Sequence, residues 1–176
     1  MIPYWLGTLL TAPGVVAHEM AHELFCHLTG TIVRKVRYFR FGNPAGYVVH
    51  DTPKHLGGSF LIAIGPLIFN TLLCAFLVQF GLARSHTAWQ SWVLIWIGIA
   101  VGMHALPSNG DASSFLAHVK QEKGFSLLYG ISVIFSLLLR LVNILRFFWI
   151  DLMYAVLVGF VLPLILSGGN SIKIFH

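Results

Sequence analysis

Residues 15–24 read VVAHEMAHEL, which places two histidines and two glutamates inside an otherwise apolar stretch. The surrounding run, from about residue 5 to residue 28, has the length and apolar character of a membrane-spanning helix. An ionisable side chain near the middle of a bilayer costs at least ~2.5–3.5 kcal/mol on insertion scales, so such clusters usually mark function. Two of the three glutamates in the chain lie in this stretch. The stretch therefore predicts a functional site inside a membrane.

The composition of the whole chain also favours a membrane protein. Of its 176 residues, 57% are hydrophobic and 10% are charged, whereas soluble domains average about 45–50% apolar and 25% charged residues. We predict an all-α integral membrane protein with about five transmembrane helices. The length suits a single domain, residues 1–176, with a core at about 5–118 and additional helices at about 125–167. The predicted spans are residues 5–28, 56–82, 88–106, 125–139 and 147–166.

The distribution of basic residues predicts the orientation of these spans. Basic residues fall between the apolar runs, which is the positive-inside pattern rather than the footprint of a nucleic-acid-binding protein. The face with more of them should be cytoplasmic, which places the N-terminus outside. That face carries Arg34, Lys35, Arg37, Arg40, Lys54, Lys120, Lys123 and Lys173, and the opposite face carries Arg84, Arg140 and Arg146.

The segment between the first two predicted spans has the pattern of a β-hairpin. Residues 32–41 are rich in β-branched and aromatic side chains, GNPAG at 42–46 is turn chemistry, and residues 47–50 resume the strand pattern. The alternative interpretation is a basic loop lying on anionic lipid. Tyr47 and His50 are candidate substrate-binding residues on this hairpin, although a histidine there is also typical of a solvated loop.

The histidines and the first glutamate form the pattern H-E-x-x-H, with His18, Glu19 and His22. On a helix, residues i and i+4 share one face, so both imidazoles can converge on a single ion. Zinc suits imidazole nitrogens, and the glutamate of this motif is placed to hold a water rather than the metal. The alternative is a polar patch that only joins helices.

A catalytic zinc usually has three protein ligands and one open position. The best source of a third ligand is MHALPSNGDASS, residues 103–114, where Pro107 breaks the third span on the side that the later turns of the first span reach. This loop presents Asp111, which is either a ligand or a helix cap before FLAHVK. His104, Glu23 and His118 are weaker ligand candidates, and Glu23 could instead support the ligands.

The second predicted span contains AIGPLIFN, residues 63–70. Gly65 and Pro66 can loosen a helix and let another backbone approach closely, and Asn70 can form a hydrogen bond across a bundle. Taken alone, the Gly-Pro pair equally fits a helix kink that has no catalytic role.

The ordered set of motifs resembles the site-2 protease family of intramembrane zinc metalloproteases. That family has H-E-x-x-H on its first core helix, matched by His18, Glu19 and His22, and G-P-x-x-x-N on its second, matched by Gly65, Pro66 and Asn70. A β-hairpin often lies between these helices. The third helix ends in Asn-x-x-Pro followed by an aspartate ligand, where this chain has HALPSNGDAS. From the order of these motifs, Asp111 matches the aspartate ligand of the family, although His104 stands where the family has asparagine.

The resemblance implies a compact prokaryotic-type protease with a three-helix catalytic core, one zinc per chain and an active site facing the cytoplasm. His18, His22 and Asp111 would be the ligands, and Glu19 the general base. His104 and Asn70 are alternative donors to the tetrahedral oxyanion. The implied substrate is a transmembrane protein in the same bilayer, and no oligomeric state is indicated. Competing interpretations are an inactive zinc-binding membrane scaffold, a membrane di-iron enzyme and a transporter.

Overall fold

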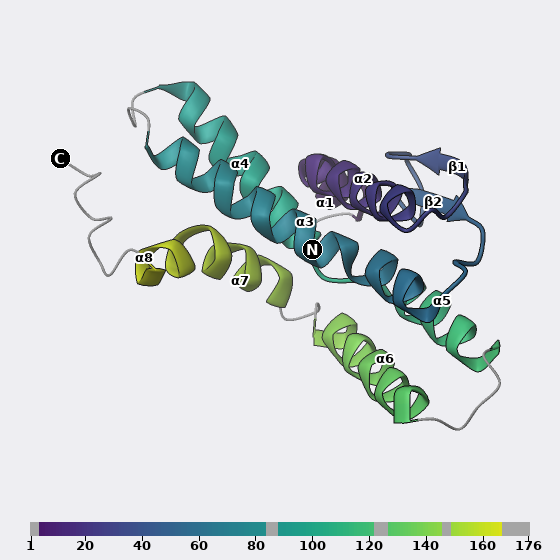
Figure 1. Ribbon diagram of the computed structural model, residues 1–176. Helices are drawn as coiled ribbons and strands as arrows, with labels where there is room; N and C mark the ends of the chain where they lie inside the picture. The colour runs from purple at the N-terminus through teal and green to yellow at the C-terminus, as the bar shows by residue number, and fades with distance from the viewer. Residues whose placement is uncertain (1–3, 84–87, 122–126, 146–148, 167–176) are drawn as a thin grey trace.

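The computed structural model is mostly helical with one two-stranded antiparallel sheet, in agreement with the predicted helical fold and hairpin (Figure 1). The structure describes residues 4–83, 88–121, 127–145 and 149–166. The elements are α1 (Tyr4–Leu10), α2 (Ala12–Leu28), β1 (Val33–Arg37), β2 (Tyr47–His50), α3 (Leu56–Leu82), α4 (Trp89–Met103), α5 (Asn109–Gln121), α6 (Leu127–Leu145), α7 (Ile150–Val156), the π-helix η2 (Leu157–Val161) and α8 (Leu162–Leu166).

The first predicted span is two helices rather than one. α1 ends at Leu10 and α2 begins at Ala12, with Thr11 between them. Pro13 lies in the first turn of α2, where a proline is favoured because the N–H groups there have no partner inside the helix. The backbone N–H and hydroxyl of Thr11 both donate to the carbonyl of Gly7 at the end of α1, at 3.1 and 3.0 Å.

The predicted hairpin forms, and it replaces the alternative of an irregular interfacial loop. β1 and β2 pair in an antiparallel register that joins Val33 to His50, with an irregularity between Val33 and Lys35. The residue at this irregularity, Arg34, donates two hydrogen bonds to the carboxylate of Asp51, at 2.8 and 2.6 Å. These hydrogen bonds hold the pKa of the Asp51 carboxyl below its ordinary value. The ion pair therefore fastens the start of β1 to the end of β2.

α3 has the predicted bounds and packs alongside α4, while α2 lies across both (Figure 1). Two glycines allow the close approach of α2. A Cβ on Gly65 of α3 would lie 2.6 Å from the ring of Phe25, and a Cβ on Gly14 would lie 2.5 Å from Nδ1 of His104. Only glycine fits at either crossing, so α2 is held against the helices that supply the rest of the site.

The C-terminal helices pack in two ways. α7 and η2 lie on α3 and α4, joined by hydrogen bonds from Gln79 to the carbonyl of Gly159 at 2.6 Å and between Thr71 and Tyr154 at 2.6 Å. α6 packs on α5 instead (Figure 1). α6 continues through Arg140, past the predicted end of the fourth span at residue 139. The predicted starts of the fourth and fifth spans, residues 125 and 147, lie outside the described residues, as do Arg84, Lys123, Arg146 and Lys173.

Helix length supports one of the five predicted spans. Within the described ranges, Leu56–Leu82 is the one helix long and apolar enough to cross a membrane. The helix α4 stops at Met103 rather than 106, and its 15 residues reach only about 22 Å along the axis, less than a hydrocarbon core of about 30 Å. Trp89–Met103, Tyr129–Leu141 and Ile150–Ile165 are shorter apolar helices.

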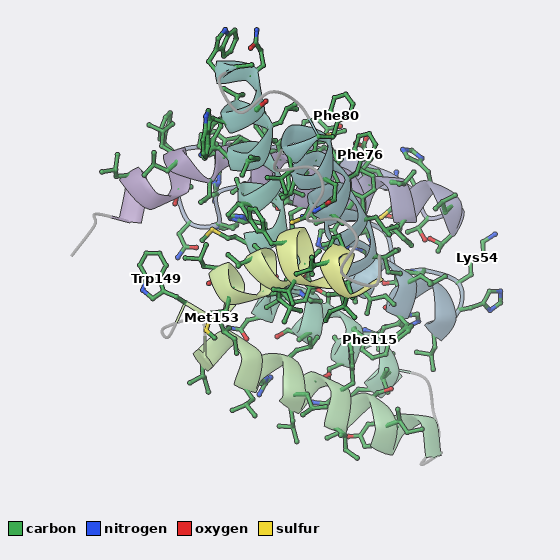
Figure 2. All side chains as sticks on the ribbon, turned by 90° about the vertical axis from the view of Figure 1, so that its left-hand side faces the viewer. Lys54, Phe76, Phe80, Phe115, Trp149 and Met153 are labelled. Atoms are coloured by element: carbon green, nitrogen blue, oxygen red, sulfur yellow. The ribbon has the colours of Figure 1, made fainter. Side chains whose placement is uncertain are left out.

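Large apolar side chains project outward from several helices. Figure 2 shows Phe76, Phe80, Trp149 and Met153 pointing away from the ribbon, and each is 44–67% exposed. The helix α6 exposes large apolar side chains along with Arg140, and its buried face is mixed, with Leu139 beside two serines. Its Ile131, Ile134, Leu137, Leu138, Leu141 and Ile144 are exposed, whereas Ser132 and Ser136 are buried.

Candidate metal centre

Three predicted ligands come together in the structure. The side chains of His18 and His22 on α2 meet Asp111 in the first turn of α5, and their ligand atoms all lie within 4.8 Å of one another. The two Nε2 atoms are 3.2 Å apart. Asp111 Oδ1 lies 3.1 Å from Nε2 of His22, and Oδ2 lies 3.6 Å from Nε2 of His18. Among the described residues, no other group of three or more His, Cys, Asp or Glu could hold a metal ion.

Backbone carbonyls fix the orientation of both imidazoles. Nδ1 of His18 lies 2.6 Å from the carbonyl oxygen of His104, and Nδ1 of His22 lies 3.0 Å from that of Ile62. A carbonyl oxygen can only accept, so each Nδ1 carries the hydrogen and donates it. In the neutral imidazole, the lone pair is then on Nε2, which is the atom that faces Asp111 and the other histidine. The two carbonyls thus select the tautomer that binds a metal through Nε2.

The carbonyl of Ile62 is free for His22 because of Pro66. In an α-helix the carbonyl of residue i accepts from the N–H of residue i+4, and residue 66 has no N–H to donate. α3 is continuous through this position. The Gly-Pro pair therefore has two separate effects: Gly65 admits Phe25 of α2, and Pro66 leaves an unpaired carbonyl where α2 passes.

The carbonyl of His104 is available because α4 ends there. If the helix continued, this carbonyl would accept from Ser108, but the N–H of Ser108 donates to Oδ2 of Asp111 at 2.6 Å. The carbonyl accepts from Nδ1 of His18 and also from the side-chain amide of Asn70, at 3.0 Å. Asn70 is fully buried. It therefore fixes the carbonyl that orients His18.

Asp111 caps α5 and also faces the two histidines, so its geometry is compatible with both interpretations that the sequence left open. Its backbone N–H donates to the hydroxyl of Ser108 at 3.2 Å, while its carboxylate accepts from the N–H of Ser108. This reciprocal pair is a capping box, S-x-x-D, with Ser108 at the N-cap of α5. The carboxylate also faces both histidines. Capping the helix thus points Asp111 at the histidine pair.

The spacing of the three groups is close to that of a zinc site. Ligand atoms at 2.0–2.1 Å in a tetrahedral zinc site are about 3.3–3.4 Å apart. Here the two Nε2 atoms are 3.2 Å apart and approach different oxygens of Asp111, at 3.1 and 3.6 Å. With one ligand atom from each residue, the three atoms lie within 4.8 Å of one another. Two nitrogen lone pairs and a carboxylate at such distances repel one another unless a cation or proton lies among them. Two histidines and one aspartate also leave the fourth position open, as in catalytic zinc sites.

Glu19 lies beside the metal cluster without belonging to it. It follows His18 directly, and its side chain is 8% exposed. The tip of the hairpin covers it, since a Cβ on Gly46 would lie 2.6 Å from Cγ and 2.9 Å from Oε1 of Glu19. The hairpin tip is in turn joined to α2 by a hydrogen bond from the hydroxyl of Tyr38 to the carboxylate of Glu23. Glu23 thus contacts the hairpin and not the ligands.

The remaining candidates lie around this centre. Nδ1 of His104 donates to the carbonyl of Ala100 in its own helix, at 3.0 Å, and its backbone oxygen contacts His18. Tyr47 has Lys35 and Arg40 near its ring, at 5.7 and 5.3 Å from the centroid. His50 and His118 line a separate pocket.

Sequence reasoning missed the groups that orient the ligands. The carbonyls of Ile62 and His104 have no side-chain signature. Two signals were nevertheless present: the missing N–H of Pro66 four residues after Ile62, and the S-x-x-D pattern that begins at Ser108.

Comparisons with protein-family models, with curated proteins and with solved structures find no match for this chain. The case for a metal centre therefore depends on the geometry of His18, His22 and Asp111 and on the groups that orient them.

Proposed function

We propose that this chain is an intramembrane zinc metalloprotease, similar to the site-2 protease family, that hydrolyses peptide bonds within or next to transmembrane segments. One observation carries the proposal. Both imidazoles of H-E-x-x-H are oriented by backbone carbonyls so that their Nε2 atoms converge with Asp111, and Glu19 lies next to them. A site with only a structural role has no use for the adjacent carboxylate, and structural zinc sites are closed by four ligands.

The residues have distinct roles in the proposed reaction. His18, His22 and Asp111 would hold one zinc, which would lower the pKa of a bound water toward ~7 and polarise the scissile carbonyl. Glu19 accepts a proton from the attacking water and returns it to the leaving amine. Burial of Glu19 beneath the hairpin tip keeps bulk water away from this exchange. Asn70 positions His18 through the backbone carbonyl of His104.

The proposed location is a prokaryotic cell membrane, with several passes and the N-terminus outside. The span-length helix α3 supports this, and so does the row of exposed leucines and isoleucines on α6. Such an arrangement fits lipid, because soluble proteins rarely expose large contiguous apolar patches. The short lengths of α4, α6 and the α7–α8 segment would then be matched by local thinning of the bilayer.

The proposed substrate is a transmembrane helix of another protein. A helix buries its peptide bonds in its own hydrogen bonds, so it must unwind locally before cleavage. β2 pairs with β1 along one edge, and within the described residues the sheet has two strands. The second edge of β2 is therefore placed to accept an unwound segment as an added strand. Tyr47 and His50 lie on that strand.

Co-expression of the chain with a panel of single-span membrane proteins tests the proposal. The purified wild type should hold about one zinc per chain, and it should cleave at least one panel member. Glu19→Gln should keep the zinc and lose cleavage. Glu23→Gln is the matched control, since it makes the same change one turn later and keeps an acceptor for Tyr38. Cleavage by Glu19→Gln at the wild-type rate would falsify the assignment, and iron in place of zinc would favour a di-iron enzyme.

A further inference from the structure

A pocket of about 330 Å³ opens next to the metal centre. Its walls come from β2 and the segment that follows it, from the first turn of α3 and from α5. The lining includes Val48, Val49, His50, Ser59, Ser114 and His118. None of these residues is a metal ligand, and Ser59 and His118 are buried, at 8% and 7% exposure.

Three elements that build the metal centre also build the pocket. On α3, Ser59 lies one turn before Ile62, whose carbonyl orients His22. On α5, Ser114 and His118 lie one and two turns after Asp111, on the same face of the helix. β2 follows Gly46, which packs against Glu19, and it reaches the pocket at Val48. The pocket therefore adjoins the metal centre along all three walls.

The distance between the metal centre and the pocket suits a bound peptide in an extended conformation. At a rise of 1.5 Å per residue, Ser114 and His118 lie about 4.5 and 10.5 Å from Asp111 along the axis of α5. An extended chain advances about 3.3 Å per residue. A peptide with its scissile bond at the metal would thus bring residues about two or three positions away into the pocket.

We propose that this pocket is the subsite that selects substrates by a neutral, hydrogen-bonding side chain, such as asparagine, glutamine, serine or threonine, two or three residues from the scissile bond. The inference rests on the proposed protease function and adds a substrate preference to it.

The chemistry of the lining excludes the other classes of side chain. No lysine or arginine is among the lining residues, so an acidic side chain finds no permanently charged partner there. The lining carboxylate, Asp51, already has both oxygens bound by Arg34, at 2.8 and 2.6 Å, and offers little to a basic side chain. An apolar side chain would cover the polar lining, including the buried Ser59, without offering it hydrogen bonds, which is unfavourable.

Binding of hydroxamates to the zinc-loaded protein in detergent tests this subsite without requiring cleavage. Acetohydroxamate probes the metal alone, and tripeptide hydroxamates with asparagine, leucine, glutamate or lysine at the residue farthest from the hydroxamate probe the pocket. The asparagine compound should bind about tenfold more tightly than the leucine compound, as two additional hydrogen bonds would give. The asparagine compound should also bind more tightly than the glutamate and lysine compounds.

Ser114→Trp fills the pocket from an exposed position, so it should fold normally. It should abolish the preference for asparagine and leave the affinity for acetohydroxamate unchanged. Ser113→Trp, at the neighbouring exposed residue outside the lining, is the control and should keep the preference. If acetohydroxamate binds but asparagine gives no advantage, or if Ser114→Trp keeps that advantage, the subsite is wrong while the metal centre stands. If acetohydroxamate does not bind the purified protein, the proposed function fails and the subsite with it.

Discussion

Nδ1 of His22 donates a hydrogen bond to the backbone carbonyl of Ile62, at 3.0 Å. Ile62 lies four residues before Pro66 in the same helix. The proline removes the helical donor that this carbonyl would otherwise have. The proline in α3 therefore determines which nitrogen of His22 on α2 faces the candidate metal centre. Groups that orient ligands in this way typically change metal affinity by 10–100-fold when they are lost.

Replacing Pro66 separates ligand orientation from helix stability. Pro66→Ala restores an N–H that competes with His22 for the carbonyl of Ile62. Zinc affinity should fall by roughly 10–100-fold. The thermal stability of the metal-free protein should stay level or rise, because proline is about 3 kcal/mol less favourable than alanine inside a helix. Competition with a zinc chelator and thermal melting in detergent measure the two quantities.

A second helical proline serves as the control for that experiment. Pro163 lies in α8, away from the metal centre, so Pro163→Ala should leave zinc affinity unchanged. A parallel fall of zinc affinity and melting temperature in Pro66→Ala would contradict the positioning role, since it would indicate general damage to α3.

The two roles of Asp111 can be separated by two variants. Ser108→Ala removes the hydroxyl that caps α5 and should lower stability by about 1 kcal/mol, while zinc binding weakens only slightly because the carboxylate remains. Asp111→Asn keeps an oxygen that can accept from the N–H of Ser108 but loses the charged ligand, so zinc binding should fall far more than stability. Zinc content after dialysis and the melting temperature check both. The reverse pattern would make Asp111 a helix cap only.

The hydrogen bond between Tyr38 and Glu23 should limit opening of the hairpin tip. Both side chains are partly exposed, so the bond is worth at most about 1 kcal/mol. Tyr38→Phe should therefore speed hydrogen exchange in residues 38–46 on the order of fivefold, which mass spectrometry can measure. The same substitution in a Glu23→Ala background should add nothing. An equal effect in both backgrounds would show that Tyr38 acts on the hairpin without Glu23.

The sequence predicted the elements and residues whose signals lie within one segment. An uninterrupted apolar run gave α3 its bounds, and the i, i+4 spacing placed His18 and His22 on one face. The break at Thr11 was missed because the apolar pattern continues across it, although Pro13 marked a helix start. The acceptor carbonyl of Ile62 and the contact between Gly46 and Glu19 depend on packing between separate elements. Such contacts leave no periodicity that a sequence can display.

Gly46 should be intolerant of any side chain, because its backbone packs directly on the proposed general base. A Cβ there would lie 2.6 Å from Cγ of Glu19 and 2.9 Å from the carbonyl oxygen of Tyr38, too close on both sides. Gly46→Ala should shift Glu19 and the hairpin tip apart, and a misplacement of ~1 Å can reduce a rate by roughly 10²-fold. Zinc content should not change, since Glu19 is not a ligand.

Gly42→Ala, in the same turn, is the control. A Cβ there meets only the side chain of Arg40, at 3.7 Å, so this variant should cleave normally. Cleavage assays on any panel member that the wild type cuts, together with zinc analysis, check the pair. Full activity in Gly46→Ala would mean that the hairpin tip leaves Glu19 before the reaction, so that this contact belongs to the resting state alone.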